Sequence, residues 1–409
     1  MEDKKGATDR LKISKFKLDA LLDITLSINA NLPTEVLLSK YENILRNNLG
    51  IGKILIFKHS GTTWECLLNG GFPKHFETID VESRLLGICE IFFGAPDLGF
   101  EGVDIIVPVY NNNVHLAFVF IGDIEEEGEG MSPVLKHLNF IQTISSIIIV
   151  AIENIRLFNE SLRQEALKKE LELASKMQMM LIPDNRHMPK NPKLIVNGFY
   201  FPHYEVGGDY YDCIRLSETK TGFCIADVSG KGISAAMLMS NFQASLRALF
   251  TFDIELETLV KKLNSIVVVN AAGEKFITLF VARYDHKSRI LEYINAAHNP
   301  PVLYNTVTGE TLHLRTSCVG IGMLDEIPLV HKSEILIKDY SKIVCYTDGL
   351  SELKYVDGKD IGTKEIIRHI SNTEPVENNI REMIKELGLP NDNPSIFDDV
   401  SIIVADLVK

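Results

Sequence analysis

The sequence predicts an α+β protein with two globular domains joined by a helical linker. A chain of 409 residues is longer than one ordinary core accommodates. Strand-like runs with short polar turns alternate with amphipathic helices in both halves, and a segment rich in Glu, Lys, Leu and Ala separates the halves. We therefore expect an N-terminal tail at 1–16, a first domain at 17–150, a coiled-coil-like linker at 151–184 and a second domain at 185–409.

The sequence of the first domain predicts helices around an antiparallel sheet. A helical pattern covers Leu18–Ala30, and a second helix follows Pro33, with Thr34 as its predicted N-cap. Strand-like runs lie at 51–59, 62–68, 103–110 and 114–121. The last two runs flank Asn111–Asn113, a short polar turn suited to a hairpin.

The phrase VPVYNNNVHLAFVFIGD at 107–123, with the helix after it, resembles a GAF-like sensory domain. This resemblance implies a sensory or dimerisation role for the first domain. The phrase contains no ligand-binding signature, so an α+β dimerisation module that binds no small molecule is an equal alternative.

The linker has an apolar seam at heptad spacing, formed by Leu167, Leu171, Ala174, Gln178 and Leu181. Such a seam needs a partner, most simply the same helix of a second chain, which predicts a homodimer. The alternative is a single helix lying on the second domain of its own chain. Gln178 is a polar seam residue that could fix the register, and Pro183 is expected to end the helix.

The composition argues against some binding partners and indicates the cellular compartment. A formal net charge of −13 argues against nucleic acid, whose phosphates require a basic face, and against a polybasic membrane anchor. The N-terminus is charged, unlike a signal peptide, and the apolar run 141–152 is shorter than the ~20 residues that span a bilayer. The six cysteines are scattered, as in a reducing compartment. We therefore expect a cytoplasmic protein with this run in a buried helix.

The second domain reads as layered, mostly antiparallel sheets covered by helices. Predicted strands lie at 194–201, 222–227, 276–284, 289–294, 301–304, 342–346 and 400–407. Predicted helices lie at 233–250, 256–271, 364–370 and 376–387.

Four aspartate-bearing phrases stand where these strands begin or end. They are VGGDYYD with Asp209, ADVSGKG with Asp227, YTDGL with Asp348, and FDDVS with Asp398 and Asp399. Asp209 follows two glycines, where the backbone can turn tightly. Strand ends can bring distant residues together at one edge of a sheet, so these carboxylates are candidates for a single site.

Grouped carboxylates would need a positive partner. At 4 Å and an effective dielectric constant of about 20, each like-charged pair costs about 4 kcal/mol. A pair of hard divalent cations removes that cost, and carboxylate oxygen suits Mg²⁺ or Mn²⁺. For each phrase alone the alternative is structural: Asp-Gly after a strand is a common turn, and Asp227 could cap the helix that begins near Ile233.

Taken together, the phrases resemble a known family. ASKMQMMLIP, VGGDYYD, ADVSGKGISAAMLM, NAAHNPPVLY, YTDGLSE and DDVSIIVADL are similar, in this order, to phrases of the bacterial PPM-type (protein phosphatase 2C-like) serine/threonine phosphatases of the stage II sporulation protein E-like branch. The similarity covers about residues 173–407. It implies a β-sandwich flanked by helices, with two Mn²⁺ or Mg²⁺ ions at one end.

The resemblance also implies a role for each site residue. Asp227 would bridge both metals, assisted by the carbonyl of Val228, and Asp209 would bind the second metal. Asp348 and Asp398 would bind the first metal. A water between the metals would attack the phosphorus of phosphoserine or phosphothreonine, so no Ser or Cys nucleophile is needed.

Some roles stay open at the level of sequence. Asp399 is the alternative to Asp398 as a ligand. Eukaryotic relatives carry an arginine near the first metal aspartate and a histidine after the bridging Asp-Val pair, whereas this chain has no arginine there and has Ser229 in the second place. His298 is a candidate proton donor, or alternatively a loop histidine. Lys231 is a candidate phosphate contact, or alternatively part of a helix-entry turn. Thr347 and Asp212 are candidates to support the metal ligands.

The resemblance implies a protein phosphatase acting on a regulatory phosphoprotein, an anti-sigma-factor antagonist, under control of the first domain. Two alternatives remain: a catalytically silent signalling scaffold, and a hydrolase of small phosphoesters.

Overall fold

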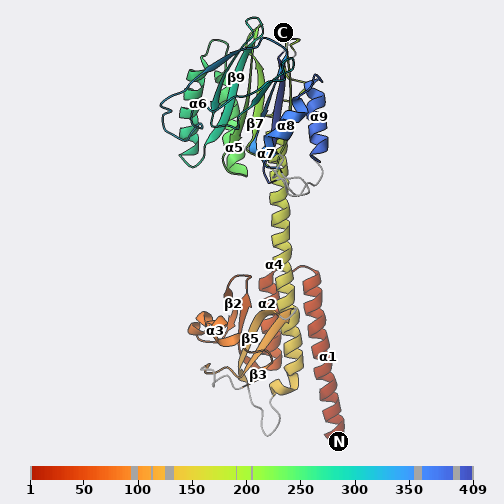
Figure 1. Ribbon diagram of the computed structural model, residues 1–409. Coiled ribbons are helices and arrows are strands. Elements are labelled where there is room, and N and C mark those ends of the chain that lie inside the picture. The colour runs from red at the N-terminus through yellow and green to blue at the C-terminus, as the bar shows by residue number, and fades with distance from the viewer. Residues whose placement is uncertain are drawn as a thin grey trace. The chain divides into compact units, whose positions relative to one another are not determined.

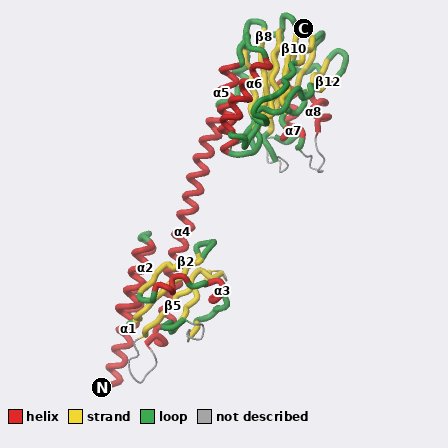
Figure 2. Tube along the Cα trace, turned by 90° about the vertical axis from the view of Figure 1, so that its left-hand side faces the viewer, coloured by secondary structure: helices red, strands yellow, loops and turns green. Residues whose placement is uncertain are grey.

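The computed structural model describes residues 2–93, 100–111, 114–124, 133–189, 191–203, 206–353, 362–389 and 397–407. The chain divides into two compact units, Met1–Glu165 and Ala166–Lys409 (Figures 1 and 2). Mixed helices and antiparallel sheets confirm the α+β class.

The N-terminal unit is built on one antiparallel sheet in the order β2-β1-β5-β4-β3. Its strands are β1 (Ile51–His59), β2 (Trp64–Gly70), β3 (Phe92–Phe93), β4 (Ile105–Asn111) and β5 (Val114–Ile124). Its helices are α1 (Glu2–Asn29), α2 (Thr34–Asn43), the π-helix η1 (Ile44–Asn48), the 3₁₀ helix η2 (Lys74–Thr78), α3 (Val81–Leu85) and the first part of α4 (Pro133–Met179). The predicted pairing of these two strands is confirmed, because β4 pairs antiparallel with β5, and residues 112–113 of the predicted turn lie outside the described residues.

Each face of this sheet carries its own core. On one face, α1, α2 and α4 pack on aliphatic strand residues, and Tyr41 bonds to Ser145 of α4 at 2.6 Å. On the other face, η2 and α3 cover a cluster of phenylalanines that includes Phe57 and Phe120. Successive residues at 54–57 of β1 and at 117–121 of β5 point alternately into the two cores.

Two expectations at the N-terminus are wrong. The residues expected as a tail belong to α1, which begins at Glu2. Thr34 is the first residue of α2, whose N-cap is Pro33, and no side chain caps the helix. Pro33 has an extended backbone, with ψ at 152°, and so sets the start of the helix without a hydroxyl.

Helix α4 contains the apolar run that the sequence assigns to a buried helix. Ile141, Ile144 and Ile148 are completely buried in the core of the N-terminal unit. By length and composition, His137–Met179 is apolar enough to cross a membrane, yet half of its apolar window is buried within the protein. A core helix meets the same test of composition.

The end of α4 differs from the predicted linker in two ways. The helix ends at Met179, before the turn that leads to Pro183. Along the predicted seam, Leu167 is exposed and Leu171 is half-buried, whereas Gln178 is buried against the C-terminal unit. At Gln178 the helix therefore packs within the C-terminal unit of its own chain. The alternative interpretation, a single helix without a partner chain, expected this contact.

The C-terminal unit is a sandwich of two five-stranded sheets, ordered β13-β10-β9-β8-β7 and β12-β11-β14-β15-β6. The first sheet consists of β7 (Tyr210–Arg215), β8 (Lys220–Val228), β9 (Ile277–Asp285), β10 (Ile290–Ala296) and β13 (Ser333–Leu336). The second consists of β6 (Leu194–Phe201), β11 (Val302–Asn305), β12 (Thr311–His313), β14 (Ser341–Tyr346) and β15 (Val400–Leu407).

Helices cover both outer faces of this sandwich (Figure 1). Helices α5 (Ile233–Leu249) and α6 (Leu256–Ala271) pack on the first sheet, and α8 (Gly362–Ile370) and α9 (Val376–Glu386) pack on the second. The short helix α7 (Asp348–Ser351) follows β14. The predicted β-sandwich flanked by helices is thus confirmed.

Candidate active site

The sandwich brings the predicted aspartates to one group of strand ends. Asp209 directly precedes β7, Asp227 is the second-last residue of β8, and Asp348 opens α7 after β14. Asp398 and Asp399 directly precede β15. A small recess there is lined by Val206, Gly207, Gly208, Asp227, Val228, Gly230, Lys231, Asp398 and Asp399.

The carboxylates perturb one another. Burial, followed by the neighbouring Asp348 and Asp398 carboxylates, raises the pKa of Asp227 to about 7. Burial, then Asp227 and Asp399, raises the pKa of Asp209 well above its usual range. Burial and Asp398 also raise the pKa of Asp348. These shifts show that negative charge is concentrated here without enough positive charge to balance it.

Asp209 is held by the phrase that contains Asp348. The Thr347 hydroxyl donates to Asp209 Oδ2 at 2.8 Å, and the backbone N–H of Ser401 donates to Thr347 Oγ1 at 3.0 Å. Thr347 is completely buried. One threonine therefore links the site ends of three strands, and Thr347 supports a candidate ligand as expected.

Asp398 and Asp399 have different environments. Both Asp399 oxygens accept backbone N–H groups, from His203 at 2.9 Å and from Gly208 at 2.6 Å, and its residue is 6% exposed. The side chain of Asp398 is 42% exposed and accepts from Lys231 Nζ at 2.9 Å. Asp399 thus ties the loop before Asp209 to β15, whereas Asp398 is the more exposed of the two carboxylates and is paired with Lys231.

Two glycines allow these close approaches. A Cβ on Gly207 would collide with the Asp399 carboxylate, and a Cβ on Gly349 would collide with the Asp399 backbone carbonyl. The glycines of the VGGD and TDG phrases are therefore required by packing around Asp399.

Helix α4 contacts the site loop through Gln178. Its amide nitrogen donates to Gly207 O at 2.5 Å, and its amide oxygen accepts from Gly207 N at 3.1 Å. The side chain is buried. Heptad spacing flagged Gln178 as unusual, but no local pattern could show that its partner lies 29 residues further along the chain.

Asp212 and Ser229 have structural partners. Asp212 is fully buried and accepts from Arg247 at 2.7 and 3.0 Å, so it joins β7 to α5 rather than supporting a ligand. The Ser229 hydroxyl accepts from Phe276 N at 2.9 Å and so fixes the loop after Asp227.

His298 is buried and bonded to β9. The residue is 3% exposed, Nδ1 lies 2.9 Å from the Thr278 hydroxyl, and burial lowers its pKa to about 3. A histidine that stays neutral at physiological pH cannot serve as a general acid, so the reading as a bonded loop histidine holds.

The residues fit a divalent metal by their chemistry. In the described part of the chain, no three His, Cys, Asp or Glu side chains stand in a ligand arrangement. Protein groups instead hold the candidates: Thr347 bonds Asp209, backbone N–H groups bond Asp399, and Lys231 bonds Asp398. Clustered, buried carboxylates with raised pKa values are the hard oxygen donors that Mg²⁺ or Mn²⁺ takes.

Comparison with known proteins agrees with this architecture. Residues 217–408 match the family model of stage II sporulation protein E (SpoIIE). The match includes Asp227, Asp348 and Asp398 and begins after Asp209.

Phosphoserine phosphatase RsbU of Bacillus subtilis (strain 168) is 27% identical over 246 residues, which cover 59% of this chain and 71% of RsbU. Phosphoserine phosphatase RsbP of the same organism is 25% identical over 189 residues, which cover 45% of this chain and 46% of RsbP. Among solved structures, the SiaA-PP2C domain of Pseudomonas aeruginosa shares the fold at a TM-score of 0.51 and 17% identity, over 59% of this chain and 97% of that domain.

The C-terminal unit is thus a phosphatase domain of the metal-dependent PPM class, and the chain is a protein serine/threonine phosphatase. Within that class, residues 217–408 match the SpoIIE type. The GAF-like resemblance of the N-terminal unit stays a prediction.

Proposed function

We propose that the chain removes phosphate from phosphoserine or phosphothreonine of a regulatory protein, in the cytoplasm, with two Mn²⁺ or Mg²⁺ ions. The observation that carries this proposal is the group of carboxylates whose pKa values are raised by burial and by one another. Such a group is costly unless a cation is bound among its members. Bound there, the ions would acidify a water and offset charge on the phosphoryl oxygens.

The chain's own residues divide the work. We assign Asp209, Asp227, Asp348 and Asp398 as metal ligands, with the Val228 carbonyl beside Asp227. Thr347 orients Asp209, which is supported by its 2.8 Å hydrogen bond. Asp399 positions the loop before Asp209 through two backbone N–H groups and is not itself assigned as a ligand.

Control by the N-terminal unit would act through α4. This continuous helix runs from the core of the N-terminal unit to Gln178, whose amide bonds both polar groups of the Gly207 peptide. Gly207 lies two residues before Asp209. A shift or rotation of α4 would therefore change the backbone that places a metal ligand, which offers a route from signal to activity.

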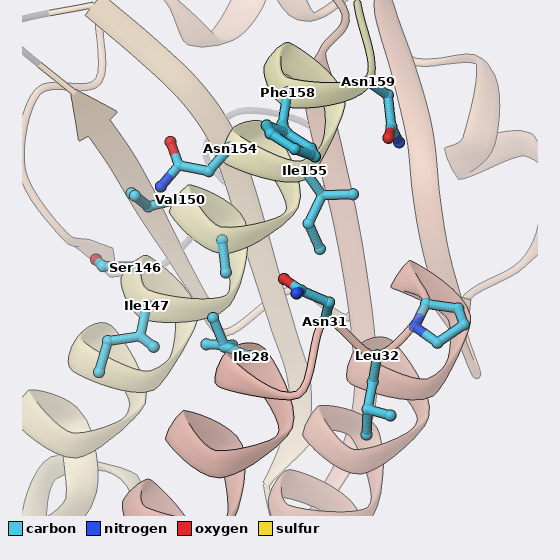
Figure 3. A pocket seen from close by; sticks show the side chains of 12 residues that line it. Ile28, Asn31, Leu32, Ser146, Ile147, Val150, Asn154, Ile155, Phe158 and Asn159 are labelled. Atoms are coloured by element: carbon cyan, nitrogen blue, oxygen red, sulfur yellow. The ribbon is translucent and has the colours of Figure 1, made fainter. Parts of the chain in front are cut away.

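We propose a second copy of the chain as the partner of α4. In the N-terminal unit, a groove of about 1000 Å³ lies between the end of α1 and α4, and Ile28, Leu32, Ile155 and Phe158 line it (Figure 3). Exposed apolar side chains continue from it along both helices: Leu11, Leu18, Leu22, Leu26, Leu157, Phe158, Leu162 and Leu167. A groove with exposed apolar side chains on the two helices that line it suits a self-complementary helical dimer.

The dimer is tested by sedimentation of the full chain. Phe158→Asp, which places a charge in the groove, is expected to convert the dimer to a monomer. Val114→Asp, at an equally exposed apolar residue on β5 of the same unit, is expected to remain dimeric. A parent chain that is monomeric at micromolar concentration would contradict the proposal.

The substrate is proposed to be an anti-sigma-factor antagonist. Support comes from the similarity to RsbU and RsbP, which are named phosphoserine phosphatases. The test is release of phosphate from such a phosphoserine protein with Mn²⁺, beside a small phosphomonoester and a metal-free control. Faster hydrolysis of the small ester would favour a general phosphoesterase, and no hydrolysis of either would favour a binding scaffold.

A further inference from the structure

The substrate phosphate has no evident cation in the ligand set, although the site is strongly acidic. Bound divalent ions offset the carboxylates, but a doubly charged phosphate still has to approach Asp227, Asp348 and Asp398. The segment before Asp209 contains no arginine. Of the described residues that line the recess, Lys231 alone has a cationic side chain.

Lys231 is held at the rim of the recess by its loop. It stands between Gly230 and Gly232, whose φ values of 80° and 79° favour glycine, directly before α5. Ser229 fastens the loop to the start of β9 through hydrogen bonds with Phe276, and Lys275 Nζ donates to Ser229 O at 2.9 Å. The loop is therefore fixed at its backbone, while the Lys231 side chain is 41% exposed.

The Lys231 ammonium is paired with a proposed metal ligand. Its Nζ lies 2.9 Å from Asp398 Oδ2 and 2.5 Å from the carbonyl oxygen of Phe397. The ammonium thus occupies a position at the Asp398 carboxylate that a bound metal ion would need. It carries three N–H donors, so it can contact more than one acceptor. When Asp398 takes a divalent ion, like charge disfavours the ammonium beside it, and a bound phosphate offers it another anion.

We propose that Lys231 is a two-position cation: it neutralises Asp398 in the metal-free enzyme and binds the substrate phosphate in the metal-loaded enzyme. This inference rests on the proposed function, because it assumes that Asp398 is a metal ligand. It assigns to Lys231 the phosphate contact that the arginine of eukaryotic relatives would supply. It also predicts effects of opposite sign on metal and phosphate.

The test compares Lys231→Gln, Lys231→Arg and Lys262→Gln with the parent chain. Lys262→Gln removes the same charge from the exposed face of α6 and serves as the matched control. Calorimetry measures Mn²⁺ binding first, and then binding of inorganic phosphate to the Mn²⁺-loaded protein. Neither readout requires turnover.

In Lys231→Gln, we expect Mn²⁺ to bind several-fold more tightly, because the competing ammonium is gone. Inorganic phosphate should bind about tenfold more weakly, the loss expected for one charge-assisted contact. Lys231→Arg should retain phosphate binding, and Lys262→Gln should match the parent in both measurements.

A Lys231→Gln protein that binds both ligands as the parent does, or binds both more weakly, would overturn the role of Lys231 and leave the proposed function standing. The second pattern would mean that the lysine only maintains the loop. A parent chain that binds no Mn²⁺ would overturn the proposed function, and the role of Lys231 with it.

Discussion

In the N-terminal unit, the buried ammonium of Lys58 lies 2.8 Å from Glu153, which also bonds Arg156. In the C-terminal unit, buried Asp209 and half-buried Asp227 have other carboxylates as their charged neighbours. The same unit pairs other buried charges directly, as Asp212 with Arg247 and Arg283 with Glu292 show. Buried Lys342 instead bonds the oxygens of Asn372, Glu374 and Asn379. Among the described residues, a group of carboxylates without balancing positive charge therefore lies at one edge of the sandwich.

This contrast separates stability from function. A paired buried charge is satisfied by the fold, so its removal should affect folding. An unbalanced cluster costs stability, and its retention is explained by a ligand that it binds. Mutations in the two regions should consequently produce different losses.

The largest effect is expected at Asp227. Asp227→Asn keeps the shape of the side chain and removes its charge, so phosphate release with Mn²⁺ should fall about thousandfold, as expected for losing several kcal/mol of metal-derived stabilisation. Asp285→Asn, at the far end of the adjacent strand β9, is the control and should retain activity. An active Asp227→Asn enzyme would remove the distinction between the two regions.

In the N-terminal unit, Lys58→Met should affect stability instead. The substitution leaves the Glu153 carboxylate buried with Arg156 as its remaining partner. The free energy of unfolding, measured in urea, should therefore decrease by about 3 kcal/mol. Adding Glu153→Gln should recover part of that loss. Mn²⁺ affinity should stay unchanged in both variants, and a large drop in affinity would show that the two regions are not independent.

The stability of the metal-free chain is expected to depend on pH through Asp227. An unfolded aspartate has a pKa of about 3.9, whereas that of folded Asp227 is about 7. Between these values the folded state holds a proton that the unfolded chain releases. The contribution of Asp227 to the unfolding free energy therefore decreases as pH rises from about 4 to about 7.

This dependence is measured as the difference between the parent and Asp227→Asn in urea titrations from pH 4 to pH 8 with a chelator. The parent should lose stability relative to the variant across this range. A difference that is flat or of opposite sign would mean that Asp227 is not strained in the metal-free protein.

The smallest effect is expected at Gln178. Gln178→Ala removes both hydrogen bonds to the Gly207 peptide without touching a proposed ligand. We expect weaker Mn²⁺ binding by about tenfold, since an unsatisfied buried group costs about 1–3 kcal/mol. Gln164→Ala, on the exposed part of α4, should behave as the parent. Equal affinities in all three proteins would contradict a role for α4 in placing Asp209.

Much of the fold could be predicted from local patterns. The bounds of β1, β6, β15 and α6 follow from continuous apolar runs or helical periodicity. Strand β7 was missed because its sequence, YYDCIR, overlaps the aspartate phrase. The start of α1 was missed because residues 2–16 are mostly polar, which made a tail the simpler reading.

The site could be predicted as a group but not in its details. Asp398 and Asp399 are adjacent in sequence, so neither composition nor spacing could separate them. Their roles depend on the backbone N–H groups of His203 and Gly208, which lie 196 and 191 residues away in sequence. The same holds for Gln178, whose role depends on the position of Gly207.

We expect the carboxylate cluster to bind two divalent ions, with Asp398 and not Asp399 among the ligands. Calorimetric titration of the metal-free chain with Mn²⁺ tests it most directly, with Asp398→Asn and Asp399→Asn beside the parent. The parent should bind two ions, Asp398→Asn should lose one of them, and Asp399→Asn should keep two ions with reduced affinity because its loop is loosened. A parent that binds no Mn²⁺ would contradict the metal site. An Asp398→Asn variant that still binds two ions as tightly as the parent would contradict the assignment of Asp398 as a ligand.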